Sequence, residues 1–80
     1  MSIRIYTGEG CENCERTMGV LTRKGIAFEA VDVDTLSEAE TDELRARGFR
    51  SLPVVITDDD AWCGLRVDKL VALTAAAVAR

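Results

Sequence analysis

The chain has 80 residues, 48% of them hydrophobic, and a formal net charge of −4 at pH 7. That length predicts one domain over residues 1–80 with a modest core, and the hydrophobic share excludes a disordered chain. No run of lysine and arginine forms a phosphate-binding face, so we expect no nucleic-acid partner. The apolar stretches are too short for a bilayer and the first residues lack a secretory signal, so we expect a cytoplasmic protein without a membrane partner.

The first half of the sequence predicts a strand, a helix and a second strand. Hydrophobic and polar residues alternate over residues 3–7. A helical pattern runs from Cys11 to Lys24, and Gly25 follows as a C-cap. Alternation returns over residues 28–34. Because crossovers of this kind are right-handed, the two strands should be parallel.

The second half predicts two more strands and two more helices. Ser37 and Glu40 form a capping box that opens a polar, largely exposed helix ending at Gly48. Residues 53–57 form a buried strand, the aspartates 58–60 a solvated turn, and residues 61–63 a strand that pairs back as a hairpin. An amphipathic helix covers residues 66–79. The expected fold is an α/β, four-stranded mixed sheet in β-α-β-α-β-β-α order, with helices on both faces.

Cys11 and Cys14 form a Cys-x-x-Cys motif where the first strand gives way to the first helix. Free backbone N–H groups and the helix dipole favour a thiolate there, and the thiolate is the nucleophile. We therefore interpret Cys11 as the attacking thiol and Cys14, one turn on and better buried, as the resolving thiol. Two zinc ligands or an inert pair are the alternatives.

Acidic residues surround this motif. Glu9, Glu12 and Glu15 are close in sequence, with Arg16 the nearest cation on the same helix. Like charge disfavours a thiolate, so we expect the pKa of Cys11 to be lowered only modestly.

Pro53 is the only proline in the chain and stands at the start of a buried strand. It either marks the strand start or forms a cis peptide bond with Leu52. The presence of a Cys-x-x-Cys motif in the same chain favours the cis bond. The backbone of Leu52 would then be free to pair with an extended substrate segment beside Cys11.

Together with these motifs, residues 62–68 make the chain resemble the NrdH-redoxin family. That family carries Trp-Ser-Gly-Phe-Arg-Pro-Asp after its hairpin, and Trp62, Gly64, Arg66 and Asp68 match it. The resemblance covers the whole chain and implies a thioredoxin-like fold and a cis bond at Pro53. It also implies that the four matching residues shape the loop where glutaredoxins hold the γ-glutamyl end of glutathione.

The resemblance further implies a function. Proteins of this family are monomeric electron donors to the large subunit of class Ib ribonucleotide reductase, and NADPH-dependent thioredoxin reductase reduces them. No cofactor beyond the Cys11–Cys14 disulfide, and no metal, is expected. Two alternatives stay open: a glutaredoxin reduced by glutathione or mycothiol, and a metal or iron–sulfur module built on Cys11, Cys14 and Cys63.

The sequence departs from the family at several positions. Cys63 replaces the serine, Leu65 the phenylalanine and Val67 the proline, while residues 8–10 replace a Lys-Pro-type approach to the first cysteine. Glu9 in place of lysine weakens the case for binding anionic glutathione.

Several side chains allow a functional and a structural interpretation. Cys63 is a third redox thiol, a regulatory site or, as we favour, a small apolar filler on an edge strand. Trp62 is expected to support the site structurally, and its N–H needs a partner if buried. Arg66 is either a free surface cation or paired with Asp68 or a nearby backbone carbonyl. Asp32 is expected at the surface and not as a proton acceptor.

Overall fold

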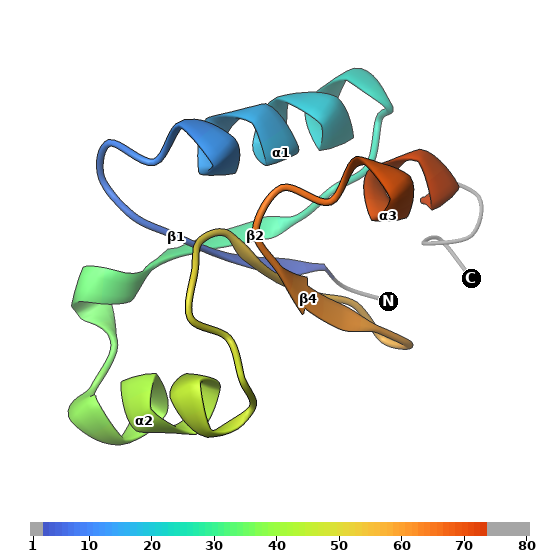
Figure 1. Cartoon of the computed structure of the whole chain (residues 1–80). Coiled ribbons are helices and arrows are strands. Elements are labelled where there is room, and N and C mark those ends of the chain that lie inside the picture. The colour runs from blue at the N-terminus through green and yellow to red at the C-terminus, as the bar shows by residue number, and fades with distance from the viewer. Residues whose placement is uncertain (1–2, 74–80) are drawn as a thin grey trace.

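The computed structural model describes residues 3–73 (Figure 1). In chain order the elements are β1 (Arg4–Thr7), α1 (Glu12–Arg23), β2 (Glu29–Asp32), the 3-10 helix η1 (Val33–Thr35), α2 (Glu38–Ala46), β3 (Val54–Ile56), β4 (Ala61–Cys63) and α3 (Val67–Ala72). This order confirms the expected β-α-β-α-β-β-α fold. Within residues 3–73, no helix is long and apolar enough to span a bilayer.

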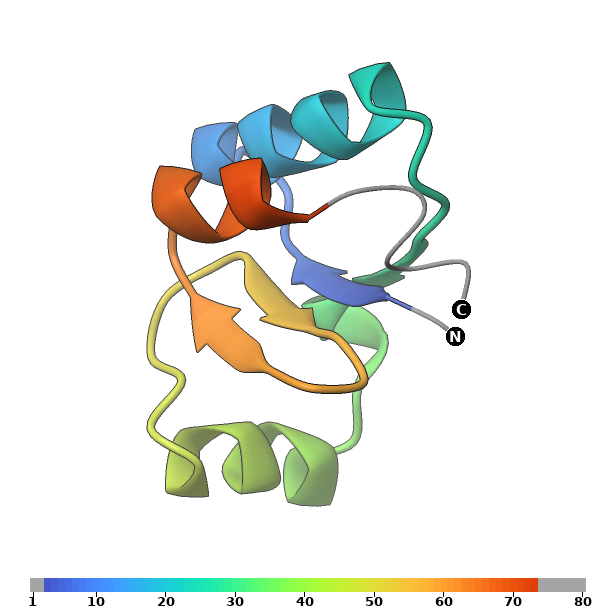
Figure 2. The same cartoon turned by 90° about the vertical axis from the view of Figure 1, so that its right-hand side faces the viewer.

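The four strands form one mixed sheet in the order β2-β1-β3-β4. β1 pairs in parallel with β2 and antiparallel with β3, and β3 pairs antiparallel with β4. Helices α1 and α3 cover one face of this sheet, whereas α2 lies alone on the other (Figure 2). The parallel first pair, the hairpin and the helices on both faces all agree with the sequence-based expectation.

The hydrophobic core lies between the sheet and the pair α1 and α3. Its central members come from the sheet and from both helices on this face. They are Ile5 and Val55 from the inner strands, Leu21 from α1 and Leu70 from α3, each at most 2% exposed. The full cluster is Ile3, Ile5, Leu21, Ile26, Val55, Trp62 and Leu70. Burying each large aliphatic side chain contributes about 1.5–3 kcal/mol, so this face carries most of the stability of the domain.

Helix α1 ends in a glycine motif that returns the chain to the core. Gly25 adopts φ 72° and its N–H donates to the Thr22 carbonyl at 3.1 Å. The next N–H, of Ile26, donates to the Leu21 carbonyl at 2.9 Å. These two bonds satisfy the last carbonyls of the helix and place Ile26 beside Leu21 in the core.

Helix α2 ends in the same way on the opposite face. Gly48 adopts φ 89° and donates to the Arg45 carbonyl at 2.9 Å, and the N–H of Phe49 donates to the Leu44 carbonyl at 3.1 Å. The motif turns Phe49 back toward Leu44, so both apolar side chains lie under the helix. At its start, the capping box of Ser37 and Glu40 is present as predicted.

Two predicted elements end two or more residues early in the structure, whereas the other boundaries differ by about one residue. The strand expected over residues 28–34 ends at Asp32, because the Asp32 carboxylate accepts the Asp34 N–H at 2.8 Å and bends the chain into η1. The helix expected over residues 66–79 ends at Ala72, where Leu73 becomes extended. Residues 74–79 lie outside the described part of the chain.

The early end of α3 is associated with a contact from Lys24, the residue that follows α1. The ammonium of Lys24 donates to the carbonyls of Leu70 and Val71, at 2.8 and 3.2 Å. A cation on the last carbonyls satisfies acceptors that a continuing helix would use, and it complements the helix dipole.

Two glycines with opposite conformations give a stability test. Gly19 lies inside α1 and Gly48 has positive φ, and a Cβ atom at either position meets nothing within 4 Å. We expect Gly19→Ala to raise the free energy of unfolding by about 0.5–1 kcal/mol and Gly48→Ala to lower it by about 1 kcal/mol. Urea unfolding followed by circular dichroism measures both, and a change of the same sign in the two variants would contradict the assignment.

Candidate functional site

The first turn of the chain sets Cys11 at the start of α1. Gly10 adopts φ 72°, and the Cys11 N–H donates to the Gly8 carbonyl at 3.3 Å. Cys11 has extended backbone, with φ −86° and ψ 101°, and is the N-cap residue of the helix. The glycine supplies a left-handed conformation that other residues adopt at a cost, so the turn is sharp enough for the cysteine to take the cap position.

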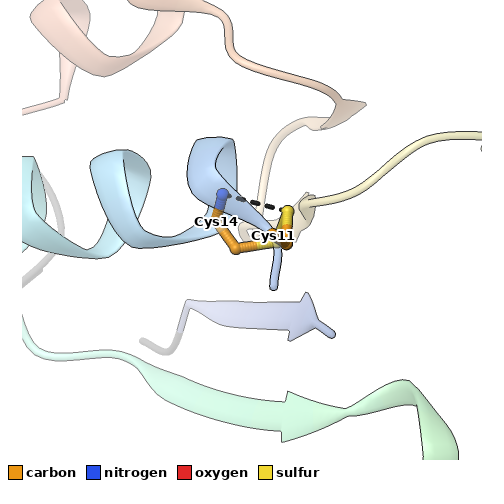
Figure 3. The surroundings of a disulfide bond; sticks show 2 residues. All are labelled: Cys11 and Cys14. Carbon is orange, nitrogen blue, oxygen red and sulfur yellow. Dashed lines mark hydrogen bonds between the residues drawn. A yellow bond between two sulfur atoms is a disulfide. The ribbon is translucent and has the colours of Figure 1, made fainter. Parts of the chain in front are cut away.

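The two cysteines of the motif form a disulfide across the first helical turn. Their Cα atoms are 5.2 Å apart, and the Cys14 N–H donates to Sγ of Cys11 at 3.2 Å (Figure 3). Cys11 is half-buried, whereas Cys14 is fully buried. One sulfur is therefore accessible to another molecule and the other is protected, which agrees with the expected burial of the pair.

The electrostatic environment of Cys11 combines opposing effects. The N-terminal N–H groups of α1 favour negative charge on its sulfur. Glu9, Glu12 and Glu15 are exposed around the same turn and oppose it. The only cation paired with them within residues 3–73 is Arg16, which lies 3.6 Å from the Glu12 carboxylate.

The loop before β3 runs past the cysteines. The Leu52–Pro53 bond is cis, as expected, and Pro53 is buried. The Gly64 N–H donates to the Pro53 carbonyl at 2.8 Å, which ties this loop to the end of β4. Leu52 itself takes part in none of the turn and loop hydrogen bonds between backbone groups of residues 3–73.

A hollow of about 720 Å³ opens beside Cys11 on the face of the sheet that carries α2. Its walls are mainly apolar and come from η1 and the residue after it, from α2, and from the loop before β3 and the start of that strand. They consist of Cys11, Val33, Leu36, Thr41, Leu44, Arg45, Phe49, Arg50, Ser51, Leu52 and Val54. The accessible sulfur thus lies at the edge of a groove large enough for side chains of another molecule.

Sequence reasoning placed Leu52 near the site but missed most of this groove. The helix over residues 37–47 is largely exposed, as expected, and α2 has no buried residue. What was not foreseen is that Leu44, and Phe49 after the helix, are half-buried and line the hollow. The signal was present in Gly48, because a glycine that ends a helix in this motif commonly brings the next residue into contact with the last helical turn.

The four residues matched to the family motif do not gather at one point. Gly64 lies against Pro53, whereas Arg66 is bound to the Asp68 carboxylate by two hydrogen bonds of 3.0 and 3.1 Å. Trp62 faces the core at 5% exposure, and its buried indole N–H has no partner within residues 3–73. None of the four lines the groove beside Cys11.

Cys63 differs from the apolar filler expected at that position. Its side chain is half-buried and accepts a hydrogen bond from the Ser51 hydroxyl at 3.5 Å. That bond, the backbone N–H groups of Arg50 and Ser51, and the charge of Arg66 lower the pKa of the Cys63 thiol, against a smaller opposing effect of burial. Cys63 is therefore a polar, partly accessible thiol.

Two further expectations concern acidic and metal-binding groups. Asp32 is exposed and its carboxylate caps η1, which confirms a surface position. Across residues 3–73, no three side chains of histidine, cysteine, aspartate or glutamate gather in a group that could hold a metal ion.

Comparison with known proteins agrees with this geometry. The family model described as glutaredoxin matches residues 3–62. The glutaredoxin-like protein NrdH of Salmonella typhimurium is 46% identical over 70 residues, which is 88% of this chain and 85% of that protein. The protein of the same name from Lactococcus lactis is 30% identical over 71 residues, 89% and 97% of the two chains.

Solved structures give the same result. The glutaredoxin-like NrdH-redoxin of Escherichia coli, described as having a thioredoxin-like activity profile, superposes with a TM-score of 0.83 at 44% identity and covers 91% of this chain and 95% of its own. A glutaredoxin from Archaeoglobus fulgidus superposes at 0.68 and 30% identity, covering 86% and 80%. With its Cys-x-x-Cys disulfide and thioredoxin-like sheet, the chain belongs to the glutaredoxin family of thiol–disulfide oxidoreductases, as an NrdH-type glutaredoxin-like protein.

Proposed function

We propose that this protein is a cytoplasmic dithiol electron carrier that reduces class Ib ribonucleotide reductase and is itself reduced by NADPH-dependent thioredoxin reductase. The observation that carries the redox role is the pairing of an accessible Cys11 sulfur with a buried Cys14 at the start of α1. The choice of partners rests on the relatives named NrdH.

In this proposal Cys11 is the attacking thiol. Its thiolate attacks one sulfur of the partner's disulfide, that S–S bond breaks, and the departing thiolate takes up a proton. Cys14 then loses its proton and attacks Sγ of Cys11, which releases the second partner thiol. Two electrons pass to the partner, and the Cys11–Cys14 disulfide of this structure is the oxidised product.

The loop before β3 and the end of β4 are the proposed contact surface for the partner. Leu52 has a backbone outside the strands and lines the groove beside Cys11, so it is positioned to pair with an extended segment. Pro53 and Gly64 hold that loop. Trp62, Arg66 and Asp68 act from outside the groove by fixing the β4–α3 connection.

Charge around the site favours a protein reductase over glutathione. Glutathione is an anion, and exposed Glu9 stands where a lysine would attract it. Arg66 belongs to the loop that the family resemblance links to the γ-glutamyl end of glutathione, and Asp68 already occupies its guanidinium with two hydrogen bonds. A free carboxylate ligand would have to displace that pair.

The recycling partner gives the first functional prediction. Oxidised protein with NADPH and thioredoxin reductase from the same source should consume NADPH in proportion to the protein disulfide. Glutathione with glutathione reductase should give a rate at least about tenfold lower, because anionic glutathione would have to approach the carboxylate of Glu9. NADPH consumption only in the glutathione mixture would replace this proposal by that of a glutathione-dependent glutaredoxin.

The roles of the two cysteines give the second prediction. Cys14→Ser should stop the reaction at a mixed disulfide between Cys11 and the partner. This intermediate is detected as a covalent complex that a reductant cleaves. Cys11→Ser should abolish reduction without any complex, and Cys63→Ser should trap nothing. A stable complex formed by Cys11→Ser through Cys14 would reverse the assigned roles.

The lowered pKa of Cys63 gives a prediction on pH dependence. In a Cys11→Ser, Cys14→Ser double variant Cys63 is the only thiol left. A lowered pKa means that thiolate is present at lower pH, so alkylation by iodoacetamide should reach half its maximal rate below the usual pKa of a free cysteine. Adding Ser51→Ala removes the main donor and should move the midpoint upward, whereas an unchanged midpoint would contradict the role of Ser51.

A further inference from the structure

The groove beside Cys11 has a charge as well as a shape. Its lining contains Arg45 and Arg50, both exposed, and no acidic residue. The one ion pair of Arg45 within the described chain is with Asp42, at 3.9 Å with both side chains more than 60% exposed, and such a pair contributes little. Arg50 is in no ion pair of residues 3–73. Both guanidinium groups are therefore available to a bound molecule.

The opposite side of Cys11 carries the reverse charge. Glu9, Glu12 and Glu15 are exposed at the start of α1. A segment that crosses Cys11 thus passes from an acidic region to a basic one, with apolar side chains of Leu36, Leu44 and the loop residue Leu52 between them on the basic side. The groove is basic because the two arginines line it, although the whole chain has a net charge of −4.

We infer that this groove binds an extended, disulfide-bearing segment of a protein partner, in which an aliphatic side chain near the cysteine fills the hollow and a carboxylate beyond it pairs with Arg45 and Arg50. This inference rests on the proposed disulfide-reductase function and adds the chemistry of the segment that is recognised. Three features support it: the apolar lining, the two arginines without a strong partner, and the half-buried Cys11 at the edge.

The redox step that accompanies docking is balanced within the two partners. The Cys11 thiolate opens the segment's disulfide, Cys14 opens the resulting mixed disulfide, and the segment leaves with two thiols while the protein keeps the Cys11–Cys14 disulfide. The segment's own disulfide is the oxidant. The guanidinium groups act only on docking, so their effect should fall with increasing ionic strength.

Synthetic disulfide peptides test the inference. Three twelve-residue peptides would share one internal disulfide and differ in their flanks: leucines with outer glutamates, leucines with outer lysines, and serines with outer glutamates. Pre-reduced protein is mixed with each peptide, and acid-quenched samples give the second-order rate constants. Because the protein has net negative charge, overall charge alone predicts faster reaction with the lysine peptide.

We expect the leucine–glutamate peptide to be reduced about three- to tenfold faster than the lysine peptide at low salt, and faster than the serine peptide. Arg50→Glu should reduce the glutamate-to-lysine ratio by at least about threefold. Arg23→Glu is the matched control, since it makes the same charge change at an exposed position at the far end of α1 and should leave the ratio unchanged.

The possible outcomes separate this inference from the proposed function. Equal reduction of all three peptides, or an equal effect of Arg23→Glu and Arg50→Glu, would overturn the inference and leave the disulfide-reductase function standing. Reduction of no peptide would count against that function itself. Occupation of the groove by a second copy of the chain would appear as dimerisation in sedimentation that Arg50→Glu abolishes, and would also overturn the inference.

Discussion

The position of one cysteine at a helix N-cap determines most of what this molecule can do. Cys11 has extended backbone, so its sulfur turns back over the first helical turn and accepts the Cys14 N–H. A serine or threonine uses its oxygen in the same way at an ordinary N-cap. With sulfur in that place, the hydrogen bond that starts the helix also stabilises negative charge on the reactive atom. Helix formation and thiol chemistry therefore depend on the same contact.

The sheet separates two environments around this contact. On one face α1 and α3 enclose a core that buries Cys14 with Leu21 and Leu70. On the other face α2 has no fully buried residue, and the groove opens beneath it. Cys11 lies at the boundary between them. The dense face shields Cys14 from outside reagents, whereas the loosely packed face leaves apolar side chains uncovered.

The sequence predicts the parts of this arrangement that local chemistry controls. Alternation, the capping box and the glycines predicted every strand and α-helix of the described residues but not η1, and the Cys-x-x-Cys position predicted which thiol is buried. The limit of α3 depended on a contact from elsewhere in the chain, the Lys24 ammonium, and propensity carries no such information. The limit of β2 depended on a local turn at Asp32, which the alternating pattern does not reveal. The groove was missed for the same reason, since Leu44 and Phe49 become a wall only when α2 is placed over the sheet. Cys63 was misjudged because its donor Ser51 is distant in sequence.

A carrier must leave each partner after it exchanges electrons, and this limits how strong its contacts can be. The ion pairs that Arg45 and Arg50 can form are exposed, so each contributes little to the lifetime of a complex. Their effect falls mainly on association, because long-range attraction orients an approaching segment before contact. In the proposed mechanism a mixed disulfide then holds the complex covalently until Cys14 attacks it. Weak, charge-oriented docking combined with a short-lived covalent bond gives selectivity on approach without slowing release.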